Sequence, residues 1–223
     1  MEYVSVAIDG PSGAGKSTLA RKAAAILGFL YVDTGAIYRT VALSAVRAGI
    51  DPADAQALIP TLDQLDIRLE YGEDGLQHMY LNGEDVSEAI RVHEISQHAS
   101  TVSAIPAVRA FLLELQRDLA RKNNVIMDGR DIGTVVLPQA QVKIFLTASP
   151  ESRAHRRYLE LQQRGQDTQL ETVLRDIIKR DEQDTNRPIA PLRQAQDAVL
   201  LDTTRLNLEQ SLQAILDIIR ERV

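Results

Sequence analysis

Short apolar runs alternate along this chain with longer segments in which apolar residues recur every three or four positions. A short run rich in β-branched residues predicts a buried strand, and the three-to-four spacing predicts an amphipathic helix. The runs predict five core strands, at residues 3–8, 29–32, 124–127, 142–146 and 198–201. The helical spacing covers residues 18–27, 36–48, 51–65, 88–100, 106–122, 150–164, 170–184 and 206–222.

The alternation of strands and helices breaks between residues 66 and 86. Residues 67–71 and 77–81 have strand patterns, and they are followed by the turn residues Gly72-Glu73-Asp74-Gly75 and Asn82-Gly83. This segment predicts a small antiparallel meander. Elsewhere the alternation is typical of a parallel sheet covered by helices. We therefore predict an α/β fold, with a five-stranded parallel sheet flanked by helices and a small antiparallel β insert.

The composition is that of one globular domain of ordinary size. The chain has 223 residues, of which 44% are hydrophobic and 25% charged. A net charge of -6 gives no general attraction to nucleic acid or to an acidic membrane. The absence of cysteine excludes disulfides, thiolate zinc sites and a cysteine nucleophile. Because the first residues lack a signal-peptide pattern and no apolar run could span a bilayer, we expect a cytoplasmic protein without nucleic-acid or membrane partners.

The most specific local pattern is G-x-x-x-x-G-K-[ST], which the chain matches at Gly10-Pro11-Ser12-Gly13-Ala14-Gly15-Lys16-Ser17. It follows the first predicted strand and precedes the first predicted helix, which is the context of a phosphate-binding loop. Glycines let several backbone N–H groups point at phosphate oxygens, and the helix presents its positive end to the same anion. Lys16 would reach the β- and γ-phosphates. The pattern predicts nucleoside-triphosphate binding but leaves open what happens to the phosphate.

Ligands of parallel α/β sheets bind at the carboxyl ends of the strands. Three segments are expected at that edge, at residues 10–17, 33–39 and 128–131. An acidic residue that ends an apolar strand beside a phosphate loop organises Mg²⁺, directly or through water, and Asp128 has this position. The Ser17 hydroxyl is expected to take another place on the metal. Asp9 is the weaker candidate, because an aspartate just before the loop can simply hold the loop backbone.

Arginines form the second signal, since the chain as a whole is acidic. Three lie on or near the proposed edge and others follow the fourth strand: Arg39, Arg109, Arg130, Arg153, Arg156, Arg157, Arg164, Arg180, Arg187 and Arg193. Part of this cluster could be a solvated helix face with pairs such as Arg156–Glu160 and Arg157–Glu160. Arginine is also the side chain best suited to grip two phosphates at once during a transfer. Residues 164–168, with Gly165 as a helix breaker, are a candidate lid tip.

Four segments together resemble the motif set of bacterial cytidylate kinase, a family of P-loop nucleoside monophosphate kinases. They are residues 10–17, Asp33-Thr34-Gly35-Ala36-Ile37-Tyr38-Arg39, Asp128-Gly129-Arg130-Asp131-Ile132-Gly133-Thr134-Val135-Val136 and Arg180-Asp181-Glu182-Gln183-Asp184-Thr185-Asn186-Arg187. Residues 142–146 and 153–157 are similar to the family too. The first motif is shared by many nucleoside triphosphatases, whereas the combination is specific. The resemblance runs nearly from end to end.

The resemblance implies phosphorylation of CMP and dCMP by ATP with Mg²⁺, giving the diphosphates for pyrimidine nucleotide metabolism, by a monomeric enzyme. It implies a CORE at residues 1–33, 106–152 and 178–223. It further implies a monophosphate-binding domain with the β insert at residues 34–105 and a short helical LID at residues 153–177. The chain departs from the family in two small ways, with Ser17 where some members have glycine and Thr34 where serine is common.

The resemblance also assigns site residues. For ATP it implies Gly10, Pro11, Ser12, Gly13, Ala14, Gly15, Lys16, Ser17, Thr18, Arg153 and Arg157. For CMP it implies Thr34, Arg39, Ser100, Arg109, Arg130, Asp131, Arg180, Asp184 and Arg187. Charge neutralisation during transfer is expected from Lys16, Arg130, Arg157, Arg180 and Arg187.

Cytosine itself limits how the base is read. It offers an N4 amino donor and an N3 acceptor, whereas uracil offers the reverse pattern. Arg109 donating to the N3/O2 edge, with Ser100 or Asp131 accepting from N4, would select cytosine. Asp184 suits a sugar hydroxyl.

Two other classes are compatible with the phosphate loop alone. One is a small P-loop kinase that acts on shikimate or on another monophosphate, against which the arginine-rich segment 180–187 and the inserted meander argue. The other is a regulatory nucleotide switch. A GTPase of that kind needs a guanine-specific motif of the N-K-x-D type, and the chain has none.

Overall fold

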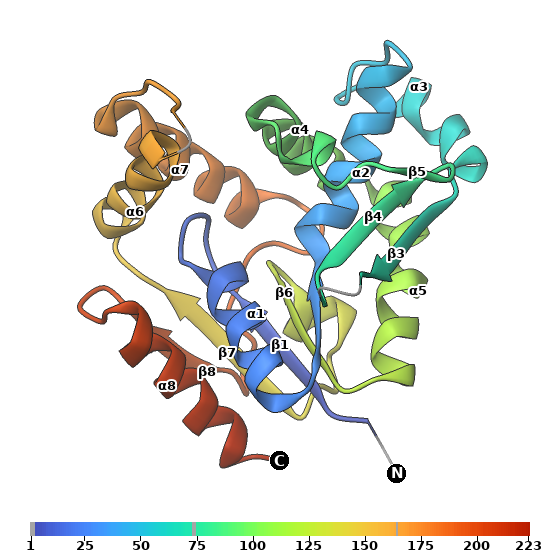
Figure 1. Cartoon of the computed structure of the whole chain (residues 1–223). Helices are drawn as coiled ribbons and strands as arrows, with labels where there is room; N and C mark the ends of the chain where they lie inside the picture. The colour runs from blue at the N-terminus through green and yellow to red at the C-terminus, as the bar shows by residue number, and fades with distance from the viewer. Residues whose placement is uncertain (1–2, 73–74, 164) are drawn as a thin grey trace. The chain divides into compact units, whose positions relative to one another are not determined.

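The computed structural model describes residues 3–72, 75–163 and 165–223. The chain divides into two compact units, of which the first comprises Met1–Tyr31 with Ala120–Val223 and the second comprises Val32–Leu119. Each unit is described separately below, with the labels of Figure 1.

A parallel sheet of five strands forms the centre of the fold. Its strands are β1 (Ser5–Asp9), β2 (Leu30–Asp33), β6 (Val125–Gly129), β7 (Val142–Thr147) and β8 (Val199–Asp202). They lie in the order β2-β6-β1-β7-β8. Strand β1 has β6 on one side, with Ile8 opposite Asp128, and β7 on the other, with Ile8 opposite Ile144. The loops after β1 and β6 therefore leave the sheet at the same edge, as the sequence predicts.

Helices of the first unit follow its strands along the chain. They are α1 (Lys16–Leu27), α6 (Pro150–Gln163), α7 (Leu170–Asn186), α8 (Leu208–Arg220) and the single π-helical turn η3 (Ile132–Val136). Helices α1 and α8 lie beside each other against β1 and β7 (Figure 1). Their shared core is formed by Val6, Ile8, Leu19, Ala20, Ala23, Ala24, Ile144, Leu146, Ile215, Leu216 and Ile219. Alanines on α1 allow the helix to approach the strands closely, so the loop that joins β1 to α1 starts from a rigid base.

Helices α6 and α7 pack against each other through a small cluster of their own. It consists of Ala154, Leu161, Val173 and Ile177. Gly165 follows α6 with φ +71°, a left-handed conformation that favours glycine, so its predicted role as a helix breaker is confirmed. Arg164, the first residue of the predicted lid tip, lies outside the described residues.

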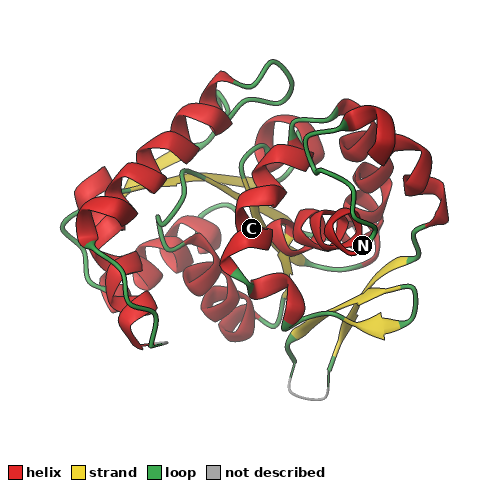
Figure 2. Cartoon of the chain, turned by 90° about the horizontal axis from the view of Figure 1, so that it is seen from above, coloured by secondary structure: helices red, strands yellow, loops and turns green. Residues whose placement is uncertain are grey.

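The second unit contains the predicted antiparallel meander. It comprises α2 (Thr34–Arg47), α3 (Ala55–Leu58), η1 (Ile59–Gln64), β3 (Ile67–Tyr71), β4 (Gln77–Leu81), β5 (Glu84–Asp85), η2 (Ala89–Arg91), α4 (His93–Ser103) and α5 (Pro106–Lys122), whose last residues belong to the first unit. The strands pair in the order β3-β4-β5, and Figure 2 shows them as a small separate sheet. Asn82 and Gly83 have φ of 51° and 86°, which makes the predicted turn a two-residue hairpin of the primed type. Residues 73 and 74 of the other predicted turn lie outside the described residues.

Two long predicted helices are wrong in detail. The helix expected at residues 51–65 is a short α3 that tightens at Ile59 into the 3₁₀ helix η1, which has Pro60 in its first turn. The helix expected at residues 88–100 is broken at Val92, whose backbone is extended. Ile90 and Ile95 are both buried, and on one continuous helix their side chains would point about 140° apart. The break lets both enter the core.

Other helix and strand ends shift by one or two residues, and one shift affects the site. The second predicted helix begins at Thr34 rather than at residue 36, because the Asp33 carboxylate caps it. The π-helical turn η3 and the two-residue strand β5 have no counterpart in the predicted pattern.

Candidate active site

The phosphate loop is shaped by glycines that no other residue could replace without strain. Gly10 has φ +153°, and a Cβ atom at this position would lie 1.9 Å from the Leu146 carbonyl oxygen. Gly13 and Gly15 have φ of 71° and 86°. Gly15 is also the N-cap of α1, and no side chain caps that helix. Its first backbone N–H groups are therefore offered to a ligand rather than to a capping residue.

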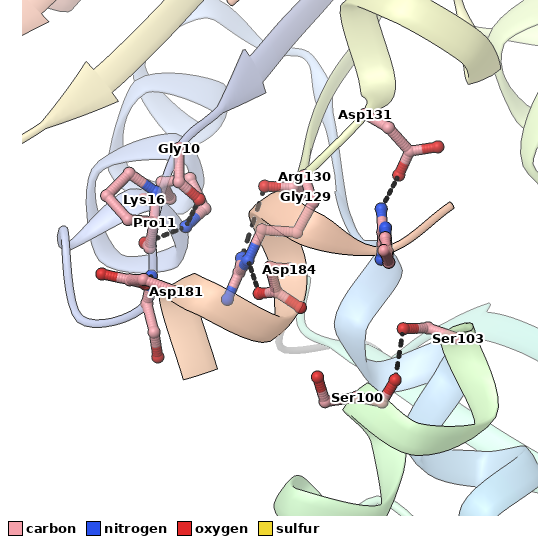
Figure 3. Close-up of polar contacts among 12 residues, drawn as sticks. Gly10, Pro11, Lys16, Ser100, Ser103, Gly129, Arg130, Asp131, Asp181 and Asp184 are labelled. Carbon is pink, nitrogen blue, oxygen red and sulfur yellow. Dashed lines mark hydrogen bonds and ion pairs between the residues drawn. The ribbon is translucent and has the colours of Figure 1, made fainter. Parts of the chain in front are cut away.

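Lys16 lies inside this loop and donates to its backbone. Its Nζ is 2.7 Å from the carbonyl oxygens of Gly10 and of Pro11, and the side chain is buried (Figure 3). Burial, with help from the charge of Arg130, lowers the pKa of Lys16 well below its usual 10.5, although nearby carboxylates oppose the shift. A phosphate arriving in the loop would stabilise the charged ammonium, so anion binding and lysine protonation are coupled.

The outer turn of the loop is braced by Arg153 and Asp181. The Ser12 N–H donates to Asp181 Oδ1 at 3.0 Å, and Arg153 Nη1 donates to the Ser12 carbonyl at 2.8 Å and to Asp181 Oδ2 at 2.6 Å. Arg153 Nε also donates to the Ala148 carbonyl at 2.8 Å. Asp181 was not among the predicted site residues. Its contact with Ser12 spans 169 residues, which no local pattern can reveal.

Ser17 and Asp128, the predicted metal-binding residues, lie within hydrogen-bond distance of each other. Ser17 Oγ donates to Asp128 Oδ2 at 2.9 Å, and the Tyr31 hydroxyl donates to Asp128 Oδ1 at 2.9 Å. These are oxygen donors, which suit Mg²⁺, an ion commonly held by one or two protein groups together with substrate phosphates. In the described ranges no group of three or more histidine, cysteine or acidic side chains could hold a metal ion alone. The residues present therefore fit a magnesium ion that arrives with a nucleotide.

Asp9 connects the end of β1 to the segment that follows β6. Its two carboxylate oxygens accept from the backbone N–H groups of Ile132 and Gly133, both at 2.8 Å. Burial raises the pKa of Asp9 from the usual 3.8 to about 6, and these two hydrogen bonds oppose the rise only in part. The prediction that this aspartate holds the backbone of the phosphate loop is wrong, because its two backbone contacts are to η3.

Beyond β6, two arginines of the motifs are paired with two aspartates. Arg130 Nε donates to Asp184 Oδ2 at 2.8 Å, and Arg187 Nη2 donates to Asp131 Oδ1 at 3.2 Å. Both aspartates and Arg187 are buried. Burial alone would raise the pKa of Asp184, but the neighbouring arginines, with Arg130 foremost, hold it below 3.8. Arg180 lies on α7 and contributes to the same field. In Figure 3, Arg130 and Asp184 lie close to the lysine of the phosphate loop.

In the second unit, Thr34 and Arg39 lie at the start of α2. Thr34 is its buried first residue. Arg39 Nη2 donates to Asp33 Oδ2 at 2.8 Å, and the other Asp33 oxygen accepts from the Ala36 N–H at 3.0 Å. Burial raises the pKa of Asp33, but Arg39 and the Ala36 N–H outweigh it, so the pKa falls below 3.8.

Ser100 and Arg109 lie on α4 and α5 of the second unit. Arg109 is buried, stacks on the Tyr38 ring with 5.6 Å between its Cζ and the centroid, and donates to the Ser103 carbonyl at 3.2 Å. The carbonyl of Ser100 accepts from Ser103 Oγ at 2.8 Å (Figure 3). The Tyr38 ring and the Ser103 carbonyl therefore restrict the position of the Arg109 guanidinium.

Helix α6 also carries Arg156 and Arg157. Arg157 pairs with Glu160 at 2.8 Å, as one alternative of the sequence predicts, and it stays partly exposed. Among the described residues, the predicted Arg156–Glu160 pair does not form. Arg156 donates instead to the carbonyl and hydroxyl oxygens of Thr203, at 2.7 and 3.2 Å.

A glycine-rich loop between the first strand and a helix of a parallel sheet, with a buried lysine and a serine–aspartate pair, defines a P-loop nucleotide-binding protein. The cytidylate kinase family model matches residues 6–221. A cytidylate kinase of Caldicellulosiruptor bescii is 48% identical over 218 residues, which cover 98% of this chain and 96% of the relative. A cytidylate kinase of Carboxydothermus hydrogenoformans is 50% identical over 214 residues, which cover 96% of each. The chain belongs to the cytidylate kinase family.

Solved structures agree at the level of the fold. An uncharacterised protein from Eubacterium ventriosum has a TM-score of 0.54 and 12% sequence identity, and the alignment covers 98% of this chain and 99% of that one. Across the described residues, none of the helices has the length and apolar character needed to cross a membrane.

Proposed function

We propose that this chain transfers the γ-phosphoryl group of ATP to the phosphate of CMP or dCMP, giving CDP or dCDP and ADP. The observation that carries the proposal is the family match over residues 6–221 together with an intact phosphate loop. An oxygen of the acceptor phosphate attacks the γ-phosphorus, and the bond from that phosphorus to the β,γ-bridging oxygen breaks. The acceptor is ionised at neutral pH, so no general base is required, and catalysis consists of alignment and charge neutralisation.

The donor side of this proposal uses the first unit. The loop residues 10–18 would hold the triphosphate, and Lys16 would exchange the carbonyls of Gly10 and Pro11 for phosphate oxygens. Magnesium would be held by Ser17, and by Asp128 directly or through water, and would offset charge on the β- and γ-phosphates. Arg157 would reach the triphosphate from α6. Arg153 already binds the loop, so it would act by keeping Ser12 and Asp181 in place as well as by its charge.

The acceptor side of this proposal uses the residues that the resemblance to the family assigns to CMP. The monophosphate would bind to arginines that now pair with aspartates, since phosphate competes well for a guanidinium. These are Arg39, Arg130, Arg180 and Arg187, with Thr34 as a hydroxyl donor. Arg109 would donate to the N3/O2 edge of cytosine and Ser100 or Asp131 would accept from N4, while Asp184 would bind the sugar. Leaving such groups unpaired with uracil costs about 1–3 kcal/mol each, which would give selectivity.

We also propose the division into CORE (residues 1–33, 106–152 and 178–223), monophosphate-binding domain (34–105) and LID (153–177). The separate cluster that joins α6 to α7 supports a lid that moves as a unit. The cytoplasmic location and the monomeric state stay predictions, which fractionation and gel filtration test.

A coupled assay of ADP release tests the reaction, with ATP, Mg²⁺ and each of CMP, dCMP, UMP, AMP, GMP and shikimate. We expect strong turnover with CMP and dCMP alone. Turnover with shikimate instead of CMP would contradict the proposal and favour another P-loop kinase. Turnover with none of the acceptors, together with slow hydrolysis of ATP alone, would favour a nucleotide switch or an unknown acceptor.

A further inference from the structure

We infer that Gln77, the first residue of β4 in the small antiparallel sheet, is a positioning residue for the acceptor phosphate. It acts by holding the backbone of Asp33, which in turn orients Arg39. This inference rests on the proposed role of Arg39. All three residues belong to the second unit, so the argument stays within one compact part of the chain.

The side-chain amide of Gln77 grips Asp33 at both of its backbone polar groups. The Asp33 N–H donates to Gln77 Oε1 at 2.8 Å, and Gln77 Nε2 donates to the Asp33 carbonyl at 3.3 Å. Strand β2 is the first strand of its sheet and has a neighbouring strand on one side only. The Gln77 amide thus forms hydrogen bonds with the N–H and the carbonyl of the last residue of β2, in the way that a neighbouring strand would. Gln77 itself is anchored by the strand pairing of β4 and by a contact of Nε2 with Met79 Sδ at 3.3 Å.

The carboxylate of Asp33 passes this restraint on to Arg39. One oxygen accepts from the Ala36 N–H and the other from Arg39 Nη2. A Cβ atom added at Gly35 would lie 3.0 Å from Asp33 Oδ1 and 3.1 Å from Arg39 Nη1. The two charged groups are therefore packed closely across a glycine, and a shift of Asp33 displaces the guanidinium.

Arg39 retains donor capacity for a ligand. Its Nε is buried and donates no hydrogen bond within the part of the chain that the structure describes. A buried donor without a partner is unfavourable unless a ligand supplies the acceptor. An anion bound to Arg39 would supply an acceptor for this Nε only where Asp33 holds the guanidinium in the correct orientation. The β insert, whose role the sequence leaves open, would in this way help to build the acceptor site.

A second contact joins the insert to α2 and provides a matched control. Arg47 and Glu84 form a two-pronged ion pair at 2.7 and 2.9 Å, at the opposite end of α2 and on the surface. Replacing Glu84 weakens the attachment of the insert without touching Asp33.

The test compares Gln77→Ala and Gln77→Leu with Glu84→Ala in steady-state assays that vary CMP and ATP separately. Removing the two hydrogen bonds of Gln77 is expected to raise KM for CMP severalfold, and by less than Arg39→Ala does, because Gln77 acts on Arg39 only through Asp33. KM for ATP should change less than about twofold, and Glu84→Ala should leave both values unchanged. Leucine preserves most of the volume, so the melting temperature of Gln77→Leu shows whether packing is intact.

A double-mutant cycle separates positioning from a structural role. In an Arg39→Ala background, Gln77→Leu should change KM for CMP less than about twofold, since the residue that it orients is gone. Full additivity of the two changes, or an equal rise in KM for both substrates, would overturn the inference. If Arg39→Ala alone leaves KM for CMP unchanged, the proposed role of Arg39 fails instead, and a chain inactive with CMP would refute the proposed function as a whole.

Discussion

Strands β1 and β2 both end at an aspartate, but the two aspartates have opposite surroundings. Asp9 bonds to the two backbone N–H groups of η3, and burial raises its pKa to about 6. Asp33 is only partly buried, Arg39 binds its carboxylate, and its pKa falls below 3.8. Position at a strand end therefore does not determine the charge state of a carboxylate; its partner does.

The helices that follow these two strands differ in how their N-termini are capped. Helix α1 begins at Gly15 without a side-chain cap, so its first N–H groups are available to phosphate. Helix α2 begins with Asp33 as its cap, which occupies the N-terminus with a carboxylate of the chain itself. In the loop between β1 and α1, an anion can bind to backbone N–H groups and to the buried Lys16. After β2, the proposed anion-binding group is a side chain, Arg39.

The largest expected effect is on kcat and comes from replacing Lys16 of the phosphate loop. Lys16→Ala should lower kcat on the order of 10²-fold or more, because a preorganised positive charge at the transferring phosphoryl group is lost. KM for CMP should change little. Initial rates at saturating CMP measure this, and Lys22→Ala, on the exposed side of α1, is the control. Normal turnover by Lys16→Ala would contradict the proposed mechanism.

The contrast in pKa predicts a pH dependence of stability. Because folding raises the pKa of Asp9 from 3.8 to about 6, the folded state binds a proton that the unfolded state releases. The contribution of Asp9 is thus most favourable below about pH 4 and is lost as the pH rises through about 6. Relative to Asp9→Asn, the unfolding free energy of the native chain should fall by about 2 kcal/mol between roughly pH 4.5 and pH 7.

Urea denaturation of both proteins across that range measures the difference. The comparison with Asp9→Asn is needed because Asp33 and Asp184 have lowered pKa values and act in the opposite direction, losing stability as the pH falls. A difference that stays constant with pH would mean that Asp9 keeps an ordinary pKa. Asp131 and Lys16 are the charged groups that act on it.

Replacing Arg39, in the segment that follows β2, should affect the binding of CMP. Arg39→Ala is expected to raise KM for CMP about tenfold or more, since charge-assisted hydrogen bonds to phosphate are strong. Arg39→Lys should recover only part of the loss, because an ammonium cannot reproduce the planar fork. KM for ATP provides the internal control. Equal effects on both substrates would assign Arg39 to general stability rather than to the acceptor.

The parts of this comparison differ in how far sequence reveals them. The phosphate loop, Lys16 and Ser17 follow from one contiguous pattern, and Asp128 from its place at a strand end. The five parallel strands follow from apolar runs and are confirmed within about two residues. These signals are local, so a single sequence carries them.

The contacts that hold the site are not local. Asp181 braces the phosphate loop over 169 residues, and Gln77 clasps Asp33 over 44. Neither side chain has a pattern around it that points to its partner. Strand β5 is equally hidden, because Glu84 and Asp85 are exposed and polar and owe their conformation to the turn at Asn82 and Gly83. Periodicity detects burial, and these features depend on pairing instead.

The smallest effect separates the two roles of Asp33, which caps α2 and orients Arg39. Asp33→Asn keeps a good cap but loses the charge, so the unfolding free energy at neutral pH should change by less than about 1 kcal/mol, while KM for CMP rises severalfold. Asp33→Ala loses both and should cost about 1 kcal/mol more. Thermal unfolding and KM measured on the same samples give the answer. If Asp33→Asn and Asp33→Ala raise KM for CMP equally but differ in stability, then the carboxylate charge orients Arg39 and capping contributes only to the stability of α2. If Asp33→Asn leaves KM for CMP unchanged, then capping of α2 is sufficient to position Arg39 and the charge is not needed.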